Sequence, residues 1–380
     1  MSEKEKDVGK VGIERASWLI NMMAAKHDPI TDDQVEAFGK NPEIGPLPCN
    51  CLSVQRIPNA CGTANTVEAT LLRDARGAMP VEGIGVAPDG KPLLLTLVGG
   101  KVAVLGRSGE VLCLTQESGS DTTEIFGWSC GELIGCTSSG EPAVLMSRMV
   151  HSEHRSGESL KQYLRDRQVK VYFGNKCVLD ERGIDAITLA RDNQALIYTK
   201  YLDAEDSFAV MRGSVELCRT KNQYRSLTEF SDGRIFGGCI GCNRRSMQCY
   251  HFVNVMNEEE EDFEAYLKEE GPDADPVLLE VDHGRQLYVK RERDSVIWVW
   301  PWQLHGFQVD VHGWDFAGHC SLVDGKVAFQ VRTRHGMVKL VITDKPQPGR
   351  FQLISRPFQR DLGWFYYGVQ GRHLYTMEIV

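Results

Sequence analysis

The stretch VEGIGVAPDGKPLLLTLVGGKVAVLG, which begins at Val81, sets out the unit from which the fold is built. A run rich in aliphatic residues leads into Asp89-Gly90, and a second such run follows. Asp-Gly pairs accept positive φ angles, which a two-residue hairpin turn requires. The stretch therefore predicts two antiparallel strands joined by a tight turn at Asp89-Gly90.

The same pattern returns six more times along the chain. The later copies begin at Gly127, Gly183, Ser226, Val277, Gly313 and Leu362. Their predicted turns are Ser139-Gly140, Asp192-Asn193, Asp232-Gly233, His283-Gly284, Asp324-Gly325 and Gln370-Gly371. Hairpins repeated roughly every 40–55 residues are typical of a β-propeller. We therefore expect an all-β chain that forms a seven-bladed β-propeller. Six or eight blades remain alternatives, because one reassigned hairpin changes the number.

The two ends of the chain are expected to differ in structure. Residues 1–48 predict a short α-helical arm followed by a Pro-rich linker, and residues 49–380 predict the propeller. Strand-like runs at 52–57 and 66–72 have no hairpin partners of their own. We expect them to complete one sheet with residues 361–380, which would join the first and last blades by backbone hydrogen bonds.

Two segments interrupt the regular spacing of hairpins. They are residues 151–168 and 257–276, and we expect both to be surface insertions with short helices. The apolar positions at helical spacing are Leu160, Tyr163 and Leu164 in the first insertion and Phe263, Tyr266 and Leu267 in the second. Such loops often carry the specificity of a scaffold.

Charge and cysteine content limit the classes of function. The net charge is −9, and residues 257–276 alone carry ten acidic side chains against Lys268. The rest of the chain is therefore formally neutral, so nucleic acid is not an expected partner. No apolar stretch approaches the ~20 residues that cross a bilayer. The twelve cysteines are spread through strand-like runs, which predicts buried thiols in the cytoplasm and no disulfide framework.

One cluster resembles a metal site in its spacing. Cys239 and Cys242 are followed by Cys249 and His251. Zinc requires four ligands that converge on one point, whereas Cys239 and Cys242 would point to opposite faces of a strand. We favour core thiols here, with zinc as the alternative, and expect no cofactor.

No catalytic signature is evident. The chain has neither a G-x-S-x-G motif nor a phosphate-binding loop. The expected inner-strand positions differ from blade to blade and form no ring of acids: Gly85, Cys130, Ile187, Glu229 and Phe316.

The period and strand–turn pattern of residues 50–380 resemble those of the WD-repeat propellers. The Trp-Asp pair that ends such blades is missing, since Trp314-Asp315 stands at a blade start, and Gly-His occurs once as a repeat element, at Gly318-His319. The resemblance implies a platform for protein interactions.

We therefore expect a non-catalytic interaction scaffold within a larger assembly. One alternative is a propeller hydrolase or lyase with a site in the central channel. A second is an RNA-associated protein that uses the basic region 326–360. The expected partner is a protein with a basic surface, and the candidate contact residues are Trp302, Glu258, Glu259, Glu260, Glu261, Phe263 and Tyr266. A solvated linker is the alternative reading of the acidic residues.

Overall fold

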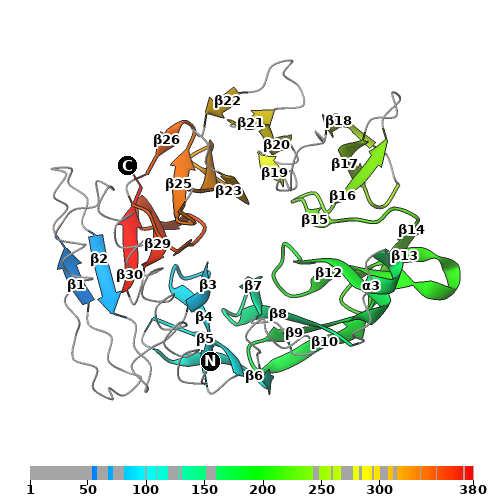
Figure 1. The fold of residues 1–380 in the computed structure, drawn as a ribbon, viewed down its shortest axis with the longest axis horizontal. Helices are drawn as coiled ribbons and strands as arrows, with labels where there is room; N and C mark the ends of the chain where they lie inside the picture. Colours follow the sequence, from blue (N-terminus) through cyan, green and yellow to red (C-terminus); the bar gives the residue numbers. More distant parts are fainter. Residues whose placement is uncertain are drawn as a thin grey trace, which may run out of the picture.

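The computed structural model describes residues 54–57, 67–71, 81–98, 101–107, 109–118, 128, 131–150, 160–242, 248–257, 260–266, 277–281, 285–292, 295–299, 307–310, 315–333, 335–347, 349–370 and 373–379. Within these residues the chain is an all-β propeller whose sheets surround a common centre (Figure 1). The expected helical arm, residues 1–48, lies outside the described residues.

Six of the described sheets are four-stranded blades, each an antiparallel meander of consecutive strands. Their strands are β3 (Val81–Val86), β4 (Pro92–Val98), β5 (Lys101–Leu105) and β6 (Val111–Ser118); β7 (Glu132–Cys136), β8 (Pro142–Met149), β9 (Arg167–Phe173) and β10 (Lys176–Arg182); β11 (Ile184–Leu189), β12 (Leu196–Leu202), β13 (Ser207–Arg212) and β14 (Val215–Thr220); β15 (Ser226–Glu229), β16 (Ile235–Cys242), β17 (Gln248–Asn254) and β18 (Glu260–Tyr266); β19 (Val277–Val281), β20 (Arg285–Glu292), β21 (Ser295–Val299) and β22 (Phe307–Asp310); and β23 (Asp315–Val323), β24 (Lys326–Arg332), β25 (Val338–Ile342) and β26 (Lys345–Pro346).

A six-stranded sheet combines both ends of the described chain. It contains β1 (Val54–Ile57), β2 (Val67–Leu71), β27 (Leu353–Ile354), β28 (Phe358–Arg360), β29 (Gly363–Gln370) and β30 (His373–Glu378). Strand β2 pairs antiparallel with β30, with Glu68 opposite Thr376. Figure 1 shows the blue strands β1 and β2 beside the red strand β30. The mixed sheet expected from the sequence is therefore present, and β27 and β28 belong to it rather than to the preceding blade.

The core lies between neighbouring blades. Val102 of β5 and Val144 of β8 belong to one buried cluster, and Val289 of β20 shares another with Phe329 of β24. Burying one such side chain stabilises the fold by roughly 1.5–3 kcal/mol. Because both faces of a blade are covered, the strands read as nearly continuous apolar runs.

The hairpins between first and second strands correct one expectation. In the first blade Gly90 has φ of +78°, and its N–H donates to the carbonyl of Ala87. The N–H of Ala87 in turn donates to the carbonyl of Lys91, so the loop has three residues rather than two. The αL glycine at the third loop position makes a G1-bulge hairpin. Among the turns of this kind that the structure describes, Asp324-Gly325, where both φ angles are positive, keeps the expected two-residue form.

The two expected insertions have different outcomes. In the first, α3 (Leu160–Asp166) is helical, and buried Leu164 packs with Tyr201 and Phe208. In the second, residues 260–266 form β18, the outer strand of a blade, rather than a helix. Pairing with β17 overrides the weak strand propensity of this acidic sequence. No helix in the described part of the chain is long and apolar enough to cross a membrane.

Strand β30 provides the test of the mixed sheet, because it pairs with β2 on one side and β29 on the other. Removing residues 371–380 should leave one edge of β2 and one edge of β29 without a paired strand. We expect cooperative melting to be lost and the new edges to cause aggregation. The measurement is circular dichroism against temperature, with removal of residue 380 alone as the control. A truncated chain that melts cooperatively within a few degrees of the full chain would contradict the role of β30.

Candidate functional site

The hairpins that join first and second strands meet at one end of the ring, which we call the turn face. It comprises the described turns 87–91, 137–141, 190–195 and 230–234. The first strands of neighbouring blades contact one another, as β3 does with β7 and β11 does with β15. The first strands of the blades all run in the same direction, so the turns that follow them lie next to each other at one end of the ring.

One hydrogen bond repeats from turn to turn. In three of these turns the second residue donates its backbone N–H to the following blade: Ser138 to the carbonyl of Asn193 at 3.1 Å, and Arg191 to Glu229 Oε2 at 2.8 Å. The N–H of Ser231 lies 2.9 Å from both carboxylate oxygens of Glu280. Successive blades are therefore joined through equivalent positions.

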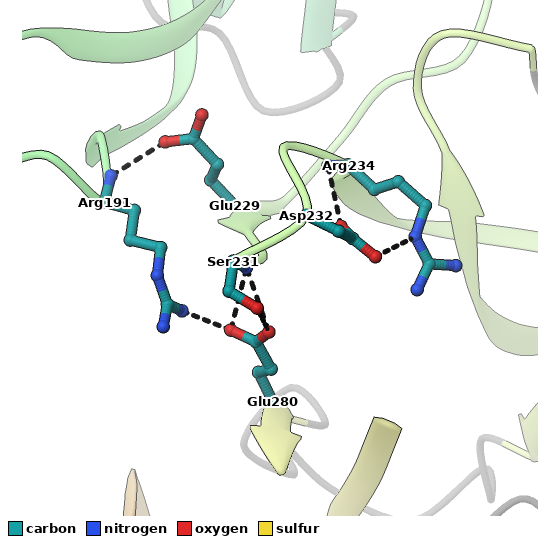
Figure 2. A network of polar contacts seen from close by, with 6 residues as sticks. All are labelled: Arg191, Glu229, Ser231, Asp232, Arg234 and Glu280. Atoms are coloured by element: carbon teal, nitrogen blue, oxygen red, sulfur yellow. Dashed lines mark hydrogen bonds and ion pairs between the residues drawn. The ribbon is translucent and has the colours of Figure 1, made fainter. Parts of the chain in front are cut away.

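Glu229 and Glu280 are the centres of this arrangement. Their side chains are only 5% and 11% exposed, and each carries its charge between two blades. The guanidinium of Arg212 binds Glu229. The guanidinium of Arg191 binds Glu280 (Figure 2). The hydroxyl of Ser231 also donates to Glu280. A buried carboxylate needs such partners, because an uncompensated charge is costly to bury.

The rim of the network is more exposed. Arg212 Nη2 lies 2.8 Å from Asp192 Oδ2, and Arg234 Nε lies 2.7 Å from Asp232 Oδ2. The backbone N–H of Gln194 lowers the pKa of Asp192, and Arg212 lowers it further. These carboxylates stay ionised and hold their own turns closed.

The chemistry open to this network is limited. Glu229 and Glu280 each accept from a backbone N–H and from an arginine that stays protonated. A general acid or base must exchange a proton with a substrate, and neither carboxylate is positioned to do so. The network therefore holds the blades to one another.

A different acid lies near the opposite end of β11. Burial raises the pKa of Asp185, while a hydrogen bond from Gln223 Nε2 at 2.7 Å and the charges of Arg167 and Arg225 oppose the rise. A perturbed carboxyl is a candidate catalytic group only beside a partner such as a second acid or a histidine. The groups that shift its pKa are an amide and two arginines.

The predicted contact residues are only partly placed. Trp302, Glu258 and Glu259 lie outside the described residues. The backbone of Glu260, Glu261, Phe263 and Tyr266 belongs to β18, with Glu260 opposite Val253 and Tyr266 opposite Cys249. The structure thus brings these four onto one outer strand and leaves their role a prediction.

The cysteine cluster divides between two paired strands. Cys239 and His251 are cross-strand partners and both are buried, and Cys249 is opposite Gly241. Cys242 is paired through its backbone with Gln248, three residues further along β16 than Cys239. No group of three or more metal-ligating side chains occurs within the described residues.

The basic region 326–360 is spread over two sheets. Lys326 and Arg332 stand at opposite ends of β24, and Lys339 is buried in β25. The guanidinium of Arg360 lies over the ring of Phe365, 4.5 Å from its centre. These positions do not form one exposed face.

The network was not predicted from the sequence, although the repeats carry a signal for it. Glu229 and Glu280 each stand two residues before the second residue of their own turn, and the aligned repeats SLTEFSDG and VLLEVDHG place Glu in the same column. An acidic residue at the same position in two internal repeats indicates a contact that both repeats make. The arginine partners could not be identified, because Arg191 and Glu280 are 89 residues apart.

Comparisons with known proteins add little to this description. No family model matches the chain, and no curated protein matches it. Among solved structures, the β-propeller domain of the Trilobed protease from Pyrococcus furiosus, described as an open velcro topology, is similar with a TM-score of 0.47 and 11% identity, over 79% of this chain and 93% of that one. A Bacteroides caccae protein of unknown function has a TM-score of 0.40 and 10% identity, over 67% and 90%. The function must therefore be argued from the residues.

Replacing Glu280 tests the blade-to-blade network. Glu280→Gln keeps the size of the side chain but removes the charge that faces Arg191 and Ser231. We expect the free energy of unfolding to fall by about 1–3 kcal/mol, less than for a fully buried pair because half of Arg191 is exposed. Urea denaturation measures the change.

The matched control is Asp232→Asn, which breaks an exposed pair inside a single turn. Its cost should stay below about 1 kcal/mol. Equal losses for the two variants would show that Glu280 does not join the blades.

The thiols give a second test. Burial raises the pKa of Cys113 to about 12 and that of Cys136 to about 11, with the charges of Asp89 and Glu141 adding to the latter. A raised pKa keeps the thiol neutral and unreactive. Alkylation of the native protein, followed by peptide mass spectrometry, should modify exposed Cys177 and spare both buried thiols at pH 7 and at pH 9. Modification of Cys113 in the native state would refute this packing.

Proposed function

We propose that this chain is a non-catalytic interaction scaffold that works within a larger assembly. The observation that carries the proposal is the commitment of Glu229 and Glu280 to arginines and backbone N–H groups of other blades. Acidic groups at the turn face thus make a rigid ring rather than a reactive centre. A rigid face with exposed loops is suited to recognition, since a preorganised surface loses little conformational entropy on binding.

The outer strand β18 supports the same proposal. It is the last strand of its sheet, and it carries Glu260, Glu261, Phe263 and Tyr266 in sequence. An outer strand offers backbone N–H and C=O groups along one edge, and acidic residues on it favour a partner with a basic surface. We propose that this strand and Trp302 contribute to the interface, and that the protein acts in the cytoplasm.

The experiment is purification of the tagged full chain from its native source, followed by native mass spectrometry. A scaffold should carry a protein partner in fixed stoichiometry. Replacing Glu260 and Glu261 with Gln should slow association with the purified partner at low salt, and less so at high salt. Glu205→Gln, an exposed acid on another blade, is the control. A monomer that retains a small molecule and turns it over would refute the scaffold role.

A further inference from the structure

Two pockets flank the turn 137–141 on the turn face. One, of about 340 Å³, lies toward the first blade and is lined by Pro88, Pro92 and Leu93 among others. The other, of about 500 Å³, lies toward the third blade and is lined by Phe173, Val178 and Tyr198 among others. The turn forms the ridge between them: Ser138, Ser139 and Gly140 line the first pocket, and Glu141 lines the second.

The floors of both pockets are apolar and well fixed. Leu93 is 2% exposed in the first pocket, and Leu196 and Tyr198 are 4% and 3% exposed in the second. The hydroxyl of Tyr198 donates to the carbonyl of Gly213 at 3.1 Å, which holds the ring in place. The floors are therefore preformed, as is usual for pockets that take apolar groups.

Val178 adds an apolar contact at the mouth of the second pocket. It falls at a register shift in β10, where Cys177 pairs with Tyr172 and Leu179 already pairs with Val171. The side chain of Val178 is left 37% exposed beside the pocket. A bulge re-aims a side chain, and here it presents an apolar one to solvent.

The rims of the pockets are mainly acidic. Five carboxylates line them, against two lysines: Asp89, Glu110, Glu141, Asp180 and Glu181, against Lys91 and Lys176. Asp89 pairs with Lys91 at 2.6 Å, Asp180 pairs with Lys170 at 3.3 Å, and Glu181 pairs with Lys200. Glu141 makes no ion pair with any described residue; Ser139 Oγ donates to its Oε2 at 3.2 Å. Glu141 is thus the rim carboxylate that an added cation can neutralise.

We propose that these two pockets and the ridge 137–141 dock an extended basic segment of a partner protein, with apolar side chains in the pockets and cationic side chains at Glu141 and the acidic rim. The inference rests on the proposed scaffold function and names its partner. An extended chain places alternate side chains on one face about 6–7 Å apart, so it can present neighbouring apolar groups to both sides of a narrow ridge. Nucleic acid and acidic peptides would meet repulsion from the same rim.

The probe is an array of ten-residue synthetic peptides whose content of Lys and Arg, Asp and Glu, and Leu and Val is varied independently. The full-length chain should retain peptides that combine basic and aliphatic residues. Fluorescence anisotropy of the best labelled peptide then gives Kd, which should rise as salt is added. Retention of acidic peptides, or of none in any class, would overturn the docking site. The scaffold proposal would stand, because co-purification tests it separately.

Variants of the residues that line the pockets should weaken or strengthen peptide binding in a predictable direction. Glu141→Lys and Val178→Asp should each weaken binding of the peptide at least tenfold, whereas Lys176→Glu should strengthen it, because it removes a cation from the rim. Glu82→Lys is the matched control: it makes the same charge change at the start of β3, away from the turn face, and should alter Kd less than twofold. Equal effects of Glu141→Lys and Glu82→Lys would show that only overall charge matters. Thermal melting confirms that each variant is folded, and the gain expected for Lys176→Glu does not depend on loss of stability.

Discussion

The backbone N–H of the second turn residue is the group on which the ring depends. It is not used to close its own loop, so it can donate across the boundary to another blade. The N–H groups concerned belong to Ser138, Arg191 and Ser231, and each donates a hydrogen bond to an acceptor on the following blade. In the first blade Pro88 has no N–H to donate to the second blade. At the junction with the mixed sheet, Tyr367 Oη donates to the carbonyl of Gly90 at 2.6 Å. Among the described residues, contacts at the turns therefore join the second blade to the third, the third to the fourth, the fourth to the fifth, and the mixed sheet to the first.

The turns themselves could be located from sequence because few residues accept αL backbone. Gly90, Gly140 and Gly233 all have positive φ at positions that the repeats identify. The loop length could not be predicted, since it depends on a side chain. Asp89 and Asp232 each accept a hydrogen bond from the backbone N–H two residues later, which stabilises the three-residue loop over the two-residue one.

Strand β18 shows where local sequence misleads. Its residues Glu260–Tyr266 favour a helix or a solvated loop by composition, yet β17 offers an unpaired edge beside them. Cross-strand hydrogen bonding then decides the structure, and that information lies in the partner strand. The same limit applies to Glu229 and Glu280, whose position repeats in the sequence but whose arginine partners stand on other blades. Trp302 and the helical arm lie outside the described residues and remain predictions.

The charges on the turn face divide it into two parts with different consequences. Around β11 to β19, buried carboxylates face arginines, so their fields cancel at short range and the charge stabilises the ring. Around β3 to β10, the acids surround open pockets, and Glu141 is left without a cation among the described residues. Glu141 is exposed and its charge is solvated, so an incoming cation can pair with it without displacing a lysine or an arginine. Neutralised acids therefore keep the platform rigid, and Glu141 beside the preformed pockets gives that platform a preference for basic partners.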